Sequence, residues 1–214
     1  MTEVTTSRAG RRKAFTDEQV FEAISSLLRE GGISTVSLPA IAKRIGFTHQ
    51  ALTYRFETRD GLLAAYAAWL WGRTHAAQER ILQEPLGPLA MVRRLFLSGA
   101  HGAGPGDRIE DSMSEMVGFL FIELQRDPAT HATFAVNQPI GEARVIQVIT
   151  RGQEAGVLDP RVPATEILDA LVYASIGASV FNNGIQRTDG AVDRVTRAFE
   201  AALARYTIES GCEA

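Results

Sequence analysis

The sequence predicts an all-α protein, and three observations lead to this prediction. Apolar residues recur at helical spacing along most of the chain, and no convincing segment alternates between apolar and polar residues with a period of two. Glycine and proline clusters interrupt the pattern where helices would end. The chain has 214 residues, of which 45% are hydrophobic and 22% charged, so it can bury a substantial core. This composition excludes the collagen-like, disordered and disulfide-scaffold classes.

Residues 1–60 predict three short helices and the beginning of a long fourth one. A hydroxyl residue that can cap a helix amino terminus precedes each of them: Thr16, Ser37, Thr48 and Thr58. Gln19 completes a capping box for the first helix. Gly31-Gly32 is expected to end the first helix and Gly46 the second. The fourth helix is expected to run to about Gln83.

Beyond Pro85 the pattern predicts further, longer helices. They are expected over residues 86–98, 109–125, 139–155, 164–182 and 191–209. Three segments between them carry loop or helix-breaking residues: residues 101–107, Asp127-Pro128 and Asn182-Asn183-Gly184. This half of the chain therefore predicts a helical body.

The net charge of −3 is unevenly distributed. Residues 1–59 carry nine Lys/Arg and six Asp/Glu, whereas the remaining chain carries 13 Lys/Arg and 19 Asp/Glu. A basic amino-terminal part on an acidic body indicates a small nucleic-acid-binding module. The basic residues Arg8, Arg11, Arg12 and Lys13 would form an arm that adds salt-sensitive affinity, or only a solubility tail.

Several other classes of function have no support in the sequence. Cys212 is the only cysteine, which excludes an intrachain disulfide and a Cys-rich zinc site. The four histidines form no H-E-x-x-H motif, and no G-x-S-x-G motif is present. We therefore expect no catalytic residue, metal or cofactor. The amino terminus lacks the apolar core of a signal peptide, and the longest apolar run, residues 62–71, is about half a bilayer span. A cytoplasmic protein is expected.

The informative motif spans residues 37–56. Two short helices joined by a tight glycine-containing turn and packed on a preceding helix form a helix-turn-helix. The small side chain of Ala42 would let the second helix cross the third closely, and Gly46 would permit the turn. Phe47 and Leu52 would fill the seam between the helices.

This motif resembles the TetR family of bacterial transcriptional regulators. The resemblance rests on three segments: Ser37…Ile41-Ala42…Gly46-Phe47-Thr48, Ala51-Leu52…Phe56, and Thr58-Arg59-Asp60-Gly61-Leu62-Leu63. It covers about residues 12–65, and over the rest of the chain it is architectural. The resemblance implies a helix-turn-helix DNA-binding domain at residues 12–60 and a helical ligand-binding and dimerisation domain at residues 61–210.

The resemblance implies roles for individual residues near DNA. Recognition-helix residues at the amino-terminal end approach base edges in the major groove, which gives this role to Thr48, His49 and Gln50. The family usually has a phosphate-contacting tyrosine where this chain has Thr53, so either Thr53 makes a shorter contact or Tyr54 replaces it. Phosphate would be contacted by Ser37, through its hydroxyl and nearby backbone amides, at the start of the second helix. Thr58 and Arg59 would contact phosphate at the start of the fourth helix.

The resemblance also implies an effector pocket and a dimer interface in the helical body. Aromatic and methionine residues would line the pocket and favour an apolar or aromatic small molecule: Trp69, Phe96, Met113, Met116, Phe119 and Tyr173. The last two helices would pack against their copies in a second subunit through Leu171, Ser175, Ala178, Phe181, Val195, Phe199 and Ala202. Helical periodicity equally allows these residues to form ordinary core.

The sequence thus predicts a homodimeric, ligand-responsive regulator that binds a palindromic operator and is released by a small-molecule effector. Repression is the expected mode, although activation would use the same fold. The alternative hypothesis is a helical-bundle carrier or enzyme whose amino-terminal helices only resemble a DNA reader. Operator sequence, effector identity and regulated genes are not encoded in any motif of the chain.

Overall fold

The structure is a computed structural model that describes residues 15–97, 127–184 and 191–208. These residues form helices, one short 3-10 turn at Ile33–Thr35 and a single isolated β-bridge between Leu158 and Thr207. The helices are α1 (Asp17–Gly31), α2 (Leu38–Ile45), α3 (His49–Phe56), α4 (Arg59–Leu82), α5 (Pro88–Leu97), α7 (Pro128–Glu154), α8 (Ala164–Gly184) and α9 (Ala191–Ala204). The all-α prediction is confirmed. The loop predicted at 101–107 and the helix predicted at 109–125 lie outside the described residues.

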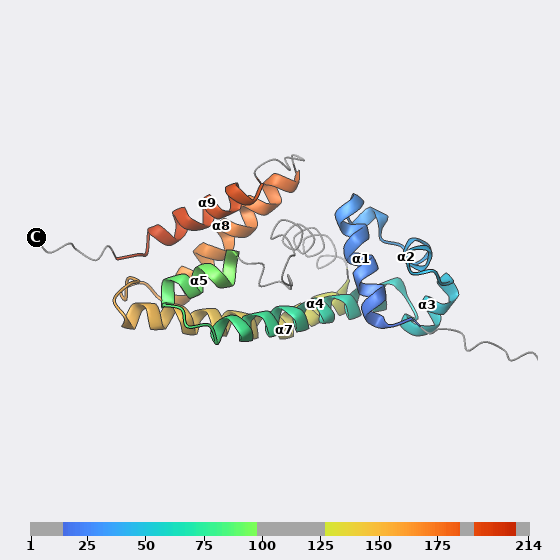
Figure 1. The fold of residues 1–214 in the computed structure, drawn as a ribbon, viewed down its shortest axis with the longest axis horizontal. Helices are drawn as coiled ribbons and strands as arrows, with labels where there is room; N and C mark the ends of the chain where they lie inside the picture. Colours follow the sequence, from blue (N-terminus) through green and yellow to red (C-terminus); the bar gives the residue numbers. More distant parts are fainter. Residues whose placement is uncertain (1–14, 98–126, 185–190, 209–214) are drawn as a thin grey trace, which may run out of the picture.

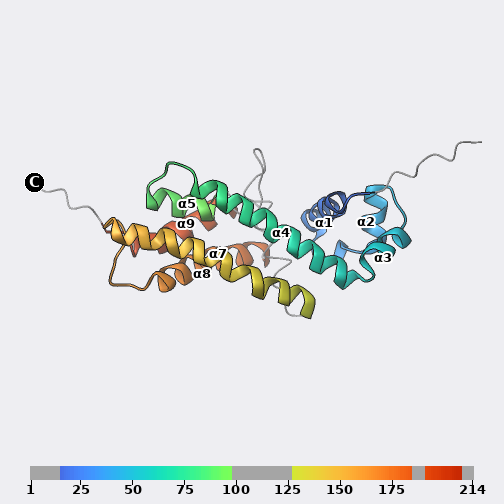
Figure 2. The same ribbon diagram turned by 90° about the horizontal axis from the view of Figure 1, so that it is seen from below.

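The molecule is elongated, with a small helical bundle at one end (Figure 1). Helices α1, α2 and α3 form this bundle, and α4 leads out of it. Helix α7 lies beside α4 in both views, whereas α5, α8 and α9 gather at the far end (Figures 1 and 2). Helix α4 therefore extends from the amino-terminal bundle toward the far end of the molecule.

The predicted helix starts in the amino-terminal part are confirmed by cap geometry. The Gln19 amide donates to Thr16 Oγ1 at 3.2 Å, and the Thr16 amide donates to Gln19 Oε1 at 3.1 Å. The predicted caps Ser37, Thr48 and Thr58 each accept a backbone N–H from the first turn of their helix. These bonds satisfy donors that a helix amino terminus would otherwise leave without a partner.

Two hydrophobic cores hold these helices together. The first joins α1, α2, α3 and the amino-terminal half of α4, and Phe134 of α7 packs onto it. Its fully buried side chains include Ile24, Leu52, Leu63 and Tyr66. The second core joins the end of α4 with α5, α7, α8 and α9. The first core extends to Trp71, well past the boundary at residue 60 that the sequence predicts.

Helix α7 begins earlier than predicted, which corrects the expected range of 139–155. The Asp127 carboxylate accepts the amides of Ala129 at 3.3 Å and Thr130 at 2.7 Å, so Asp127 caps a helix that starts at Pro128. Pro139 lies inside this helix with its side chain exposed. A proline in a helix interior costs about 3 kcal/mol, and packing of α7 along α4 outweighs that cost. Sequence reasoning that treated Pro139 as a boundary was wrong for this reason.

The last two helices also end at other residues than predicted. Helix α8 continues to Gly184, so Asn182-Asn183-Gly184 is its final turn rather than a connecting turn. Helix α9 ends at Ala204, five residues before the predicted end, because the chain beyond it pairs with the segment after α7. There the Asp159 amide donates to the carbonyl of Tyr206 at 2.8 Å, and the Ile208 amide donates to that of Val157 at 3.2 Å.

Candidate nucleic-acid interface

Helices α2 and α3 form the helix-turn-helix that the sequence predicts. Gly46 adopts the left-handed conformation at φ 76°, which favours glycine, and the Phe47 amide returns to the carbonyl of Ala42 at 2.9 Å. Ala42 is buried at the crossing of the helices, and Leu52 is fully buried on the inner side of α3. These contacts fix α3 to the bundle by one face and leave its opposite face outward.

The outward face of α3 carries the residues predicted to read DNA. Thr48, His49, Gln50, Thr53 and Tyr54 are all exposed, and the Tyr54 side chain has 93% of its surface accessible. An aromatic side chain this exposed contributes nothing to the packing of α3. It is available to a binding partner.

The hydroxyls of Thr53 and Tyr54 differ in whether they are already used inside the protein. The Thr53 hydroxyl donates to the backbone carbonyl of His49 at 3.0 Å, within its own helix. A phosphate oxygen can only accept a hydrogen bond, and this internal bond uses the single hydroxyl proton of Thr53. The Tyr54 hydroxyl extends from the same surface, where 93% of the side chain is accessible. Its position favours Tyr54 as the donor.

The amino termini of α2 and α4 lie close to each other in the bundle. Arg59, the first residue of α4, donates from Nε to the carbonyl of Val36 at 3.5 Å, directly before the Ser37 cap. Its Nη1 lies 3.9 Å from Asp60 Oδ1. Arg59 therefore links the two helix starts that sequence analysis assigns to phosphate contacts.

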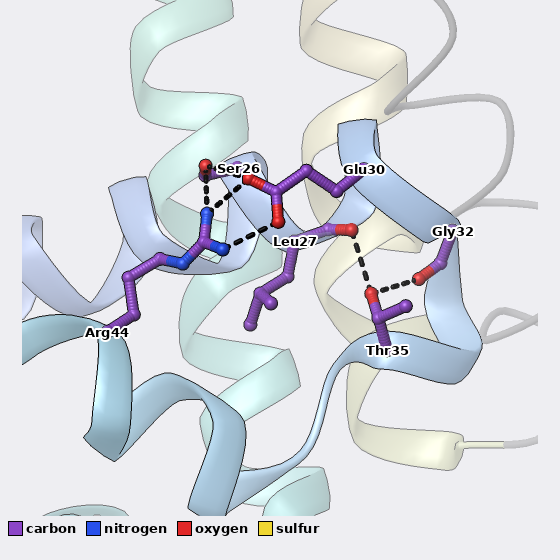
Figure 3. A network of polar contacts seen from close by, with 6 residues as sticks. All are labelled: Ser26, Leu27, Glu30, Gly32, Thr35 and Arg44. Carbon is purple, nitrogen blue, oxygen red and sulfur yellow. Dashed lines mark hydrogen bonds and ion pairs between the residues drawn. The ribbon is translucent and has the colours of Figure 1, made fainter.

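Two other arginines of this domain bind carboxylates of α1. Arg44 reaches from α2 to Glu30, with Nη1–Oε1 at 2.6 Å and Nη2–Oε2 at 2.5 Å, and also contacts Ser26 (Figure 3). The hydrogen bonds to Glu30 hold the pKa of Arg44 above its usual value. Arg55 of α3 binds Asp17 through two parallel bonds at 3.1 and 2.8 Å. Both pairs attach the helix-turn-helix to α1.

A further contact fixes the connection between α1 and α2. The Thr35 hydroxyl lies 2.7 Å from the carbonyl oxygen of Leu27 and 2.8 Å from that of Gly32 (Figure 3). These bonds satisfy carbonyl groups at the end of α1. The connection is thereby held against the helix that supports α2 and α3.

The described residues predicted for the effector pocket do not come together. Trp69 packs in the first core against Phe21 and Tyr66, with ring centroids at 5.5 and 5.7 Å. Phe96 packs in the second core, 5.1 Å from the ring of Phe199. The side chain of Tyr173 is 69% exposed. Three further predicted residues lie outside the described residues: Met113, Met116 and Phe119.

Four of the residues predicted for the dimer interface are buried inside the single chain. Leu171 and Phe199 are fully buried, and Ser175 and Val195 are 4% and 8% exposed. A side chain that is already covered has no surface left to bury against a second subunit, so these four residues pack the helical body itself. Of the other predicted residues, Ala178 and Ala202 are half-buried, and Phe181 is 66% exposed.

Two other features bear on function: possible metal ligands and possible membrane-spanning helices. Among the described residues, no group of three or more His, Cys, Asp or Glu side chains could hold a metal ion. One described helix, α8, contains an 18-residue stretch, Ala164–Phe181, that is long and apolar enough to cross a membrane, with a mean hydropathy of 1.3. A single helix of this kind is weak evidence for a membrane protein, because core helices of soluble proteins pass the same test.

Comparisons with known proteins agree with this geometry. Residues 20–66 match the family model described as bacterial regulatory proteins, tetR family. A TetR transcription regulator from Haloarcula marismortui is 19% identical with a TM-score of 0.72, over 90% of this chain and 98% of that one. A putative transcriptional regulator from Saccharomonospora viridis in complex with choline is 16% identical with a TM-score of 0.75, over 90% and 97%.

A third solved structure with this fold is SmeT, the repressor of the Stenotrophomonas maltophilia multidrug efflux pump SmeDEF. It is 18% identical with a TM-score of 0.55, over 92% of each chain. A search of curated proteins gave no significant match. At these identities the solved structures establish the fold.

The exposed helix-turn-helix and the family match over residues 20–66 support a DNA-binding regulator. More particularly, the match over residues 20–66 confirms, for that segment, the resemblance to the TetR family of bacterial regulators found in the sequence.

Proposed function

We propose that this protein is a homodimeric repressor that binds a palindromic operator and is released by a small-molecule effector in the cytoplasm. The observation that carries the proposal is the outward face of α3, where Tyr54 is 93% exposed directly beside the fully buried Leu52. Two such recognition helices in a dimer would enter successive major grooves about one helical turn apart. SmeT, which shares the fold, is itself a repressor.

The contacts with DNA follow from position on the helices. Thr48, His49 and Gln50 stand at the exposed amino-terminal end of α3 and would meet base edges. The amide of Gln50 suits a bidentate pair with adenine. Phosphates would be bound by Tyr54, with Thr53 beside it, and by the residues at the starts of α2 and α4: Ser37, Thr58 and Arg59.

The dimer is proposed to form through the exposed stripe of α8. Tyr173, Gly177, Val180 and Phe181 follow one another at helical spacing and are all exposed. This stripe accounts for a helix that is apolar along 18 residues yet has only 28% of them buried within the chain. A two-fold axis would place the stripe against its own copy, with Ala178 and Ala202 at its edge.

A buried polar atom supports a small-molecule effector. The side chain of Trp71 is 9% exposed, and its Nε1 has no hydrogen-bond partner among the residues that the structure describes. Buried indole N–H groups usually find an acceptor, and leaving one without a partner costs about 1–3 kcal/mol. An apolar or aromatic effector with an acceptor oxygen would supply this bond. The fold is known to take small molecules, since the Saccharomonospora viridis regulator is in complex with choline.

A mobility-shift assay with the DNA upstream of its own gene tests the proposal. We expect sequence-preferring binding that weakens with salt, because phosphate contacts release counterions. Tyr54→Ala should abolish this binding without changing the helical content, since the side chain packs on nothing. Tyr173→Ala is the matched control at protein concentrations at which it is still dimeric, since it removes an equally aromatic, exposed side chain from α8.

A second measurement, of oligomeric state, should give the opposite pattern for the two variants. By light scattering, Tyr54→Ala should remain dimeric, whereas Tyr173→Ala should dissociate at lower dilution than the wild type. A wild-type chain with no preference for any upstream fragment would refute the proposal. A promoter-reporter strain distinguishes repression, in which deletion of the gene raises expression, from activation.

A further inference from the structure

Helices α4 and α7 are joined by a polar cluster that has no counterpart in the predicted sites. The ring of His75 on α4 lies between two side chains of α7. Its Nε2 is 3.2 Å from Asn137 Oδ1, and its Nδ1 is 3.0 Å from Arg144 Nη1. All three side chains are partly buried, so water competes with these bonds less than at an open surface.

The partners of His75 determine which of its nitrogens carries the proton. Asn137 Nδ2 donates to the carbonyl of Thr133 at 2.8 Å, which orients the amide so that Oδ1 faces the ring. Oδ1 can only accept, so Nε2 must carry a hydrogen. A guanidinium can only donate, so Nδ1 must be free of one. The geometry therefore requires neutral His75 in the Nε2–H tautomer.

Arg144 also contacts other groups of α4 besides the His75 ring. Its Nη2 lies 2.6 Å from Glu79 Oε1, and its Nη1 also contacts Gln78 Oε1 at 3.3 Å and the carbonyl of His75 at 3.4 Å. The guanidinium thus connects two consecutive turns of α4 to α7. Within the His75 ring, Nδ1 is the atom that accepts a hydrogen bond from Arg144.

A proton on Nδ1 would break this arrangement. It would turn the acceptor into a donor and place a second positive charge beside the guanidinium of Arg144. The charged groups recorded around the ring are Arg144 on α7 and, beyond it, Glu79 on α4. Among the described residues, the other groups that contact the ring are uncharged: Trp71, whose ring stacks on His75 at 5.5 Å, and Asn137.

Helix α4 connects this cluster to the DNA-binding end. Arg59 begins α4 at the candidate interface, and Tyr66 one third along it bonds Ser25 of α1 at 2.8 Å in the first core. From residue 59 to residue 75 a continuous helix spans about 24 Å. A change of angle at His75 is therefore transmitted to α1 and to the helix-turn-helix by a single rigid element.

We infer that the cluster of His75, Asn137 and Arg144 is a joint that positions α4 on α7 only while His75 is neutral, so that protonation of His75 releases α4 and lowers operator affinity. The inference rests on the proposed function for its last step. The sign follows from the geometry, since the joint needs the unprotonated ring. The joint is formed while the ring is neutral and is lost when the ring is protonated.

The first experiment observes the ring directly. In uniformly 15N-labelled full-length protein, the two ring nitrogens of His75 should show the Nε2–H pattern at about pH 7.5, assigned by its disappearance in His75→Gln. The control His131→Gln removes an exposed histidine of α7, the helix that carries Asn137 and Arg144. A Nδ1–H pattern, or a ring already protonated at that pH, would overturn the inference.

The second experiment measures the consequence for DNA. Between about pH 7.5 and about pH 5.5 the wild type should lose about tenfold more affinity for its upstream DNA than His75→Gln loses. Glutamine can accept from Arg144 and donate to Asn137, so it retains the joint and does not titrate. Comparison of the two proteins removes the contribution of His49 in α3, which both retain. His131→Gln should follow the wild type.

A further variant keeps the test decisive if His75→Gln does not fold. Arg144→Met removes the donor to Nδ1, so its operator affinity at about pH 7.5 should fall toward that of the wild type at about pH 5.5 and change little between the two. Parallel pH profiles of the wild type, His75→Gln and Arg144→Met would overturn the inference. Wild-type protein that binds no DNA at either pH would instead refute the proposed function, while the tautomer still decides whether the joint exists.

Discussion

Two helical glycines with opposite surroundings provide a quantitative test of the packing between α7 and the segment that follows it. A Cβ added at Gly152 in α7 would lie 2.8 Å from Leu158 Cδ1, 3.2 Å from Leu158 Cγ and 3.4 Å from Pro88 Cβ. Leu158 is fully buried, so it has little room to move away. A Cβ added at Gly72 in α4 would meet nothing within 4 Å, and Gly72 is exposed.

These distances determine the expected sign of each substitution. Replacing a helical glycine by alanine gains about 0.5–1 kcal/mol from helix propensity alone, and Gly72→Ala should show this gain. At Gly152 the added methyl overpacks the core, which costs about 1–3 kcal/mol. We therefore expect Gly152→Ala to lower the free energy of unfolding by about 1 kcal/mol. For a chain of this length that corresponds to a fall of about 2–4 °C in the melting temperature.

Thermal unfolding followed by circular dichroism measures both effects at one protein concentration. Leu158→Ala provides the critical control, because removal of its side chain removes the clash. In that background Gly152→Ala should become stabilising and resemble Gly72→Ala, which gives a coupling energy of about 1–3 kcal/mol. If Gly152→Ala raises the melting temperature as much as Gly72→Ala does, the packing of Leu158 against α7 described above is wrong.

Three other predictions concern the helix-turn-helix and the start of α7. Leu52→Ala should lower the free energy of unfolding, measured in urea, by about 2–5 kcal/mol, because removal of the fully buried side chain leaves a cavity behind α3. A decrease below about 1 kcal/mol would mean that α3 is not held by this residue. Gly46→Ala should lower the free energy of unfolding by about 1 kcal/mol, because a Cβ is disfavoured in the left-handed conformation at φ 76°. Gly46→Asn should lower it less, and equal decreases would exclude backbone strain as the cause. Burial alone would raise the pKa of Asp127, but hydrogen bonds from Thr130 and Ala129 outweigh it and hold that pKa below its usual value. The carboxylate therefore stabilises the fold above its ordinary titration range and ceases to do so as the pH falls through the lowered value. In acid titrations the difference in melting temperature between wild type and Asp127→Ala should narrow below about pH 4, and a constant difference would contradict this assignment.

The amino-terminal part of the fold was predictable because its signals are local. A hydroxyl before a helix satisfies amides within its own first turn, and a glycine at positive φ ends a helix without help from distant residues. Thr16, Ser37, Gly46, Thr48 and Thr58 occupy these positions in the structure as the sequence indicates. The outward position of the residues predicted to read DNA follows from the same short-range pattern, since Leu52 determines which face of α3 is buried.

Helix ends in the body of the molecule were harder to predict because long-range contacts decide them. Pro139 carries a local signal for a helix boundary, yet α7 continues through it along α4. Helix α9 stops at Ala204 because Tyr206 and Ile208 pair with the segment after α7, which is distant in sequence. Neither contact can be inferred from neighbouring residues in the chain.

The sequence by itself determined that the protein is all-α, that a helix-turn-helix lies near its amino terminus and that it resembles the TetR family. Only the tertiary structure decided which apolar side chains are buried within one subunit. Leu171 and Phe181 both fit the helical periodicity of α8, but the first is fully buried and the second 66% exposed. Periodicity identifies a buried face without identifying what covers it. The same holds for His75, whose role depends on Asn137 and Arg144 more than 60 residues away in the chain.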